Sequence, residues 1–204
     1  TYGKKSLLNK MPGDFDEKFS NLKAFLTYMY AHPGKKLLFM GNEIASYYEW
    51  NCDKQINWEI MGNEKNKNFF NFIKDLNFIY KREKAFYEID FSPDGFKWID
   101  FSDYEKSIIS FIRKGKKEIL IIVFNFTPIT RTNYRIGVPF RCDYIEILNT
   151  DSHFYGGKNI GNFGKVKCED ISFHNQPYSI KITLPGLSGL IFKPDYNSNS
   201  LKKD

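Results

Sequence analysis

The sequence predicts an α/β segment followed by an all-β domain, and two patterns within its 204 residues predict this fold class. Up to about residue 90, apolar residues recur at helical spacing on both sides of one short apolar run. From about residue 91, short strand-like runs separated by turn residues replace that spacing, which is typical of an antiparallel sandwich. We therefore expect a boundary near residues 88–95, a β domain over 91–196 and a polar, disordered tail over 197–204.

Two helices are predicted before residue 90. Asp14 is placed to cap the first helix, with Asp16 and Glu17 in its first turn, and His32-Pro33-Gly34 ends it. The apolar face of this helix is formed by Phe15, Phe19, Leu22, Leu26, Met29 and Tyr30. The face of the second helix is formed by Phe69, Phe72, Ile73, Leu76, Ile79 and Tyr80.

One strand is predicted between the helices. The run Leu37–Met40 is short, apolar and bounded by turn signals, which suits a strand buried on both faces of a parallel sheet. Because such a strand needs a neighbour on each side, residues 1–90 are expected to be an incomplete α/β unit. The polar and aromatic stretch 42–67 shows no clear period, so we expect a long irregular loop there.

Seven strands are predicted after the boundary. Ser179–Leu184 alternates, with Ile180, Ile182 and Leu184 on one face, and Ile119–Phe124 is continuously apolar, as in a central strand. The seven runs are Phe96–Phe101, Ser107–Arg113, Glu118–Phe126, Asn133–Val138, Tyr144–Leu148, Ser179–Leu184 and Gly189–Lys193. A Gly-rich surface loop is predicted between the fifth and sixth of them, from Tyr155 to Gly164.

Composition and charge disfavour several classes of protein. The net charge is +6, but the basic residues are scattered, whereas a nucleic-acid surface would gather them on one face, so we predict no nucleic-acid partner. No apolar run approaches the ~20 residues that cross a bilayer, so we predict no membrane association. Aromatic residues make up 18%, which fits sheet packing and also sugar stacking.

Cysteine and histidine usage predicts neither a metal site nor a cofactor. Cys52, Cys142 and Cys168 lie far apart in sequence and are odd in number, which indicates free thiols in a reducing cytoplasm. The three histidines are equally dispersed. The chain begins with Thr1 and a loop-like segment, so we expect it to be cut from something longer.

Several colinear segments resemble bacterial glycogen (1,4-α-glucan) branching enzymes, which are α-amylase-type glycoside hydrolases. The resemblance covers nearly the whole chain except about the last ten residues. The matching segments are Gly3–Asp14, His32–Glu43 with Glu49-Trp50-Asn51, Asp75-Leu76-Asn77 with Tyr80, Asn125–Pro128, Glu146–Ser152, the Tyr155–Gly164 glycine pattern and Leu184-Pro185. The Lys4–Asp14 and Glu146–Ser152 segments are typical of branching enzymes and disfavour a debranching hydrolase.

The resemblance implies the terminal part of a (β/α)8 barrel, namely its last strand and last two helices, followed by the C-terminal sandwich. It implies an enzyme that cleaves α-1,4 links and transfers the chain to a 6-hydroxyl, with retention through paired carboxylates. The family's nucleophile, acid/base and stabilising Asp fall before Thr1, so no residue here is expected to be catalytic and the isolated chain is expected to be inactive. The implied partners are α-1,4-glucan chains and the missing N-terminal part of the same enzyme.

Six residues are candidates for substrate binding. Asn42 and Glu43 follow the predicted barrel strand at its C-terminal end, where the functional residues of such barrels concentrate. The resemblance places Tyr2, Lys4 and Lys5 beside the absent Asp, and Trp50 in the loop where its ring could stack on glucose. The alternative is structural for each. A non-catalytic module that binds glucan or supports a barrel is the alternative for the whole chain.

Overall fold

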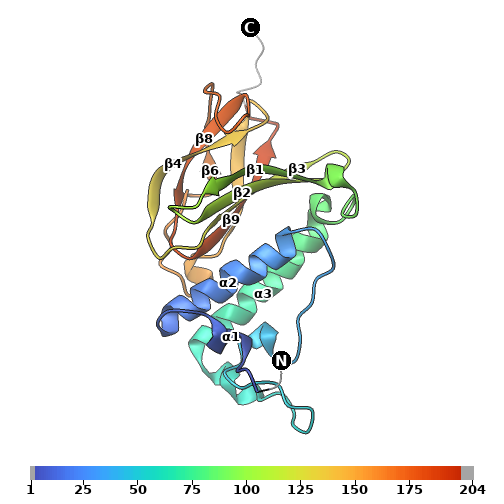
Figure 1. The fold of residues 1–204 in the computed structure, drawn as a ribbon, viewed down its shortest axis with the longest axis vertical. Helices are drawn as coiled ribbons and strands as arrows, with labels where there is room; N and C mark the ends of the chain where they lie inside the picture. The colour runs from blue at the N-terminus through green and yellow to red at the C-terminus, as the bar shows by residue number, and fades with distance from the viewer. Residues whose placement is uncertain (1–2, 199–204) are drawn as a thin grey trace.

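The computed structural model describes residues 3–198 (Figure 1). Its α-helices are α1 (Leu7–Lys10), α2 (Phe15–Ala31) and α3 (Glu64–Arg82), and short 3-10 helices cover Asn42–Ile44, Trp58–Gly62, Lys84–Phe86, Pro93–Gly95 and His153–Tyr155. Its strands are β1 (Phe96–Asp103), β2 (Ile108–Lys114), β3 (Ile119–Asn125), β4 (Arg131–Val138), β5 (Asp143–Asn149), β6 (Lys165–Val166), β7 (Cys168–Glu169), β8 (Tyr178–Leu184) and β9 (Ser188–Asp195).

Helix α2 begins at the predicted cap. The Asp14 carboxylate accepts the N–H groups of Asp16 and Glu17 at 2.9 Å each, and Glu17 accepts the Asp14 N–H at 3.0 Å, which completes a capping box. Helix α3 starts earlier than its apolar stripe, because Asn63 caps it by accepting the N–H of Lys65 at 2.9 Å. Both predicted helices are confirmed.

The β part consists of two antiparallel sheets. Six strands pair in the order β1-β2-β3-β9-β5-β6, and three pair in the order β4-β8-β7. All seven predicted strands are present in the described residues. Strands β6 and β7 were not predicted, because each is only two residues long and so short a segment shows no periodicity.

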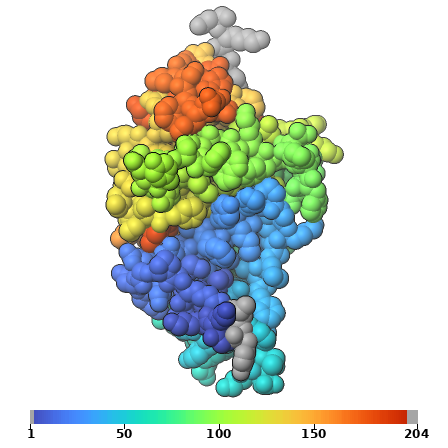
Figure 2. Space-filling view, in the orientation of Figure 1, coloured from blue at the N-terminus to red at the C-terminus, as the bar shows by residue number. Residues whose placement is uncertain are grey.

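Strand β3 is apolar throughout because both its faces are covered. Leu120, Ile122 and Phe124 belong to the core shared with α2 and α3, whereas Ile121 and Val123 face the core shared with the three-stranded sheet. Figure 1 shows α2 and α3 side by side beneath the larger sheet, and Figure 2 shows the helical part packed directly against the β part. Each face of the larger sheet therefore carries its own apolar core.

The predicted strand Leu37–Met40 is wrong. This run forms no strand in the described part of the chain; Leu37 is 70% exposed and Phe39 46% exposed. The run ends in left-handed backbone at Met40 (φ 34°) and Gly41 (φ 89°). A strand requires main-chain partners beside it, and no described segment pairs with this one.

The structure bears on the membrane prediction only over the described residues, and on only the first part of the predicted tail. Among residues 3–198, no helix is both long and apolar enough to cross a bilayer. Asn197 and Ser198 follow β9 in a turn, and the rest of the predicted tail, 199–204, lies outside the described residues.

Candidate functional site at the tip of the helical part

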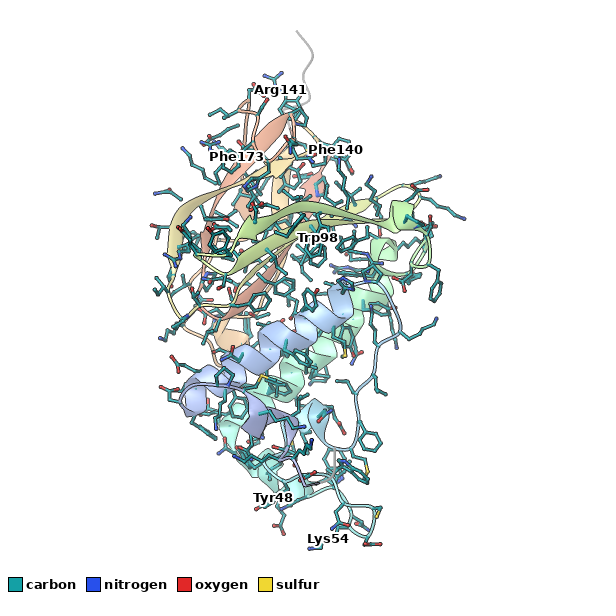
Figure 3. All side chains as sticks on the ribbon, viewed as in Figure 1. Tyr48, Lys54, Trp98, Phe140, Arg141 and Phe173 are labelled. Atoms are coloured by element: carbon teal, nitrogen blue, oxygen red, sulfur yellow. The ribbon has the colours of Figure 1, made fainter. Side chains whose placement is uncertain are left out.

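An open pocket of about 380 Å³ lies in the loop between α2 and α3. Trp50 lines it together with Tyr48 and Glu49, and Met40, Ser46, Asn51, Lys54, Gln55, Ile56 and Asn57 complete the wall. Figure 3 places Tyr48 and Lys54 at the end of the molecule farthest from Arg141 in the β part. The stretch 42–63 therefore shapes this tip, whereas residues 64–67, predicted as part of the same irregular loop, belong to α3.

Glu49 ties the start of the chain to this loop. Its two carboxylate oxygens accept the backbone N–H groups of Lys4 (3.1 Å) and Lys5 (3.2 Å). Lys4 and Lys5 are themselves exposed, and Lys5 has a positive φ of 68°. Two of the predicted site residues are thus held beside the pocket-lining residue Glu49. Tyr2 lies outside the described residues.

Asn42 and Glu43 lie on a tight turn next to the pocket and do not line it. Glu43 accepts the N–H of Gly41 at 3.1 Å, and Gly41 accepts the N–H of Ser46 at 3.0 Å. A Cβ at Gly41 would lie 3.1 Å from the Ser46 Cβ, so glycine permits this close approach as well as the left-handed backbone. The turn therefore abuts the pocket wall at Ser46, with both predicted side chains partly exposed.

Trp50 is half-buried, and its ring packs edge-on against Phe39 with centroids 5.5 Å apart. Tyr48, by contrast, is 61% exposed. Trp50 therefore supplies an aromatic wall that a neighbouring ring orients, while Tyr48 supplies a free aromatic surface.

Asn66 on α3 is the buried anchor of this loop, and our sequence analysis missed it. Its amide donates to the carbonyl oxygens of Ile44 (2.7 Å) and Ala45 (3.2 Å), and its side-chain oxygen accepts from the Tyr47 hydroxyl. Burial raises the pKa of Tyr47, which keeps this hydroxyl a donor. Its position in the sequence could have indicated burial, because Asn66 lies one helical turn before Phe69, on the apolar stripe of the helix.

A second set of polar contacts joins the helices to the β part. The buried Lys23 ammonium donates to the Tyr155 carbonyl at 3.1 Å, and the Tyr155 hydroxyl donates to Asp75 at 2.8 Å. Burial lowers the pKa of Lys23 to about 8, and the negative charge of Asp151 opposes that shift. The glycine-containing loop after β5 is therefore fastened to both α2 and α3.

The chemistry available at the tip is binding and positioning. Glu43 and Glu49 accept hydrogen bonds from main-chain amides, so their carboxylates serve the shape of the loop. Among residues 3–198, no three histidine, cysteine or acidic side chains gather where they could hold a metal ion.

The β part matches a known family. Residues 98–195 match the family described as "Alpha amylase, C-terminal all-beta domain". This part of the chain belongs to that family. The match covers the strands from Trp98 in β1 to Asp195, the last residue of β9, so the α-amylase C-terminal domain and the two-sheet part coincide almost completely.

Outside the C-terminal domain the similarity extends through the helices. The chain is 48% identical over 194 residues to 1,4-alpha-glucan branching enzyme GlgB from Aquifex aeolicus, covering 94% of this chain and 31% of that protein. It is 46% identical over 195 residues to the enzyme of the same name from Halothermothrix orenii, covering 95% of this chain and 31% of that protein. The resemblance to branching enzymes is therefore confirmed, and the chain spans about a third of the length of the curated relatives it matches.

A solved structure shares the fold at low sequence identity. The native form of the Nostoc punctiforme debranching enzyme superposes with a TM-score of 0.61 and 16% identity, over 95% of this chain and 34% of that chain. At this identity the likeness concerns the fold alone.

Proposed function

We propose that this chain acts in 1,4-α-glucan branching, as the part of the enzyme that follows the catalytic carboxylates. The observation that carries the proposal is identity of 46–48% that runs through both helices and the C-terminal domain, over 94–95% of the chain. The substrate class is α-1,4-glucan, and the partner is the catalytic portion of the same enzyme.

Residues 1–90 are the end of a (β/α)8 barrel in this proposal, residues 91–196 the C-terminal sandwich and 197–204 a tail. The run Leu37–Met40, in which Leu37 and Phe39 are exposed, supports this division, because neighbouring barrel strands would supply main-chain partners for it. Helices α2 and α3 are then the last two barrel helices, and their packing on the larger sheet seats the barrel on the C-terminal domain.

The candidate substrate residues Tyr2, Lys4, Lys5, Asn42, Glu43 and Trp50 form part of the rim of the glucan cleft. Support comes from Glu49, which fixes Lys4 and Lys5 beside the pocket that Trp50 lines. The free thiols of Cys52, Cys142 and Cys168 support a cytoplasmic location.

An amylose–iodine assay tests the proposal. A protein that contains this chain together with the proposed catalytic portion should lower the iodine colour of amylose while forming α-1,6 links. The isolated chain should leave the colour unchanged. Release of reducing ends without new α-1,6 links would instead indicate a hydrolase and overturn the proposal.

The second candidate is a non-catalytic module that binds glucan or supports a barrel. It is favoured because the carboxylates of Glu43 and Glu49 accept hydrogen bonds from main-chain amides, so the residues at the tip serve binding and positioning. Glucan retention by the isolated chain, with no branching by the protein that also contains the proposed catalytic portion, would select this candidate.

A further inference from the structure

A hollow of about 410 Å³ lies on the β part, away from the tip pocket, with which it shares no lining residue. Strand β5 and the loop that follows it form the hollow, and Phe154 and Phe163 are among the residues that line it. Both rings are exposed, Phe154 at 68% and Phe163 at 104% of the reference area. The volume falls within the range typical of small-ligand sites.

The floor of this hollow is built rigidly. The Glu146 carboxylate accepts from the amides of Asn162 (2.5 Å) and Asn149 (3.5 Å). Asn162 also pairs with the main chain of Thr183 through both its amide nitrogen (3.1 Å) and its oxygen (2.7 Å), and Asn149 donates to the Ile160 carbonyl at 2.8 Å. Because these groups already have partners, the floor is preformed and costs little to order on binding.

Phe163 has a strained backbone conformation and a side chain that is not packed in the core. Its φ is 54°, in the left-handed region, where a bulky side chain is strained by roughly 1–3 kcal/mol. Its neighbour Asn162 is buried and anchored, so the backbone directs the Phe163 ring out of the core. Strained backbone of this kind is concentrated at functional positions, ligand clamps among them.

The lining selects the class of ligand. None of the described residues that line the hollow is basic, and Glu146 is acidic, so phosphates and nucleic acids are disfavoured. Asn159 and Ser152 add an amide group and a hydroxyl group beside the two rings. A ligand that fits carries hydroxyl groups, no charge and an apolar face, because polarised C–H groups are attracted to the negative face of an aromatic ring.

We propose that this hollow is a saccharide-binding site in which Phe154 and Phe163 stack on sugar rings. That the sugar is an α-1,4-linked glucan rests on the proposed function; that the site takes a saccharide rests on the hollow itself. The site would hold a glucan chain on the C-terminal domain, separate from the tip pocket.

The test is titration of the 204-residue chain with maltoheptaose, following the backbone amide signals of Gly161, Asn162 and Gly164 by NMR. Because these signals belong to residues of the hollow, they distinguish binding there from binding elsewhere on the protein. Phe163→Asn removes the ring and places a residue that tolerates left-handed backbone, so the variant should unfold at the same or a higher temperature. Its Kd at this hollow should be about 5- to 10-fold larger than that of the wild type.

Phe91→Ala is the matched control, because Phe91 is 78% exposed and does not line the hollow. It should leave the Kd unchanged. The proposed site is overturned if folded Phe163→Asn binds maltoheptaose with unchanged affinity. It is also overturned if none of maltoheptaose, cellohexaose and xylohexaose shifts the amide signals of the hollow in the wild type. Shifts with cellohexaose or xylohexaose but not maltoheptaose keep the saccharide site and count against the proposed glucan function, which the iodine assay tests separately.

Discussion

The guanidinium of Arg113 on β2 lies 2.6 Å from the carboxylate of Asp90, and both side chains are buried. Arg113 also donates to the carbonyl of Ala31 at 2.7 Å, at the C-terminal end of α2, and to those of Phe86 (2.8 Å) and Gly95 (3.2 Å). Asp90 in turn accepts the N–H of Gly34 at 3.1 Å. One ion pair thus joins the end of α2, the segment after α3 and the larger sheet.

Asp90→Asn should destabilise the chain strongly. The substitution keeps the shape but leaves the Arg113 charge buried without its counter-ion, which costs about 3–5 kcal/mol. Urea unfolding measures the change. Asp170→Asn is the control, since Asp170 pairs with Arg141 at the surface (57% and 48% side-chain exposure), and should cost about 0–1 kcal/mol. Equal effects of the two variants would contradict a central role for the buried pair.

Asn66→Ala should loosen the loop at the tip. It leaves the carbonyls of Ile44 and Ala45 and the Tyr47 hydroxyl without their partner, at a cost of about 3 kcal/mol. The midpoint of thermal unfolding should fall by roughly 2–4 °C for each kcal/mol. Asn71→Ala, at an exposed position of the same helix, should change the midpoint far less. A midpoint unaffected by Asn66→Ala would show that water replaces these contacts.

Glu49→Gln should free the start of the chain without unfolding the protein. Two N–H donors face the two carboxylate oxygens, whereas a glutamine offers only one acceptor. Hydrogen exchange at the Lys4 and Lys5 amides should accelerate by on the order of tenfold. Glu59→Gln, an exposed position in the 3-10 helix Trp58–Gly62, should leave both amides unchanged. Unaltered exchange in Glu49→Gln would refute the link to Glu49.

Lys23 should make the stability depend on alkaline pH. Its pKa is about 8 in the folded chain, lowered by burial, against 10.5 as the ordinary value. The unfolded chain therefore binds more protons between these pH values, so the free energy of unfolding rises with pH there. Relative to Lys23→Met, the wild type should gain up to about 3 kcal/mol across this window.

The Lys23→Met comparison isolates one group. Lys36 also has a pKa lowered by burial to about 8, but it titrates in both proteins and cancels in the difference. Urea unfolding of both proteins below pH ~8 and near pH ~10 gives the two differences to compare. A difference that stays constant with pH would mean that the folded protein solvates the Lys23 ammonium well.

Local patterns carried most of the fold prediction. The cap at Asp14, the stripes of α2 and α3 and the alternation in β8 depend on neighbours within a few residues, so the chain itself reveals them. Leu37–Met40 misled for the same reason: its pattern is strand-like, but pairing depends on segments beside it. Of the candidate substrate residues, Trp50 lines the tip pocket and Asn42 and Glu43 lie next to it, and their role in binding stays a prediction.

The sequence by itself determined α2, α3 and seven of the strands, the cap at Asp14 and the kinship with branching enzymes, because each depends on residue order and short-range spacing. Only the tertiary structure decided which polar groups are already engaged: Glu49 with Lys4 and Lys5, Asn66 with the 44–47 turn, Lys23 with Tyr155. It also showed that Phe163 faces water. Such contacts join residues as far as 132 positions apart, and hydrogen bonds are set by distance in space, which no local pattern encodes.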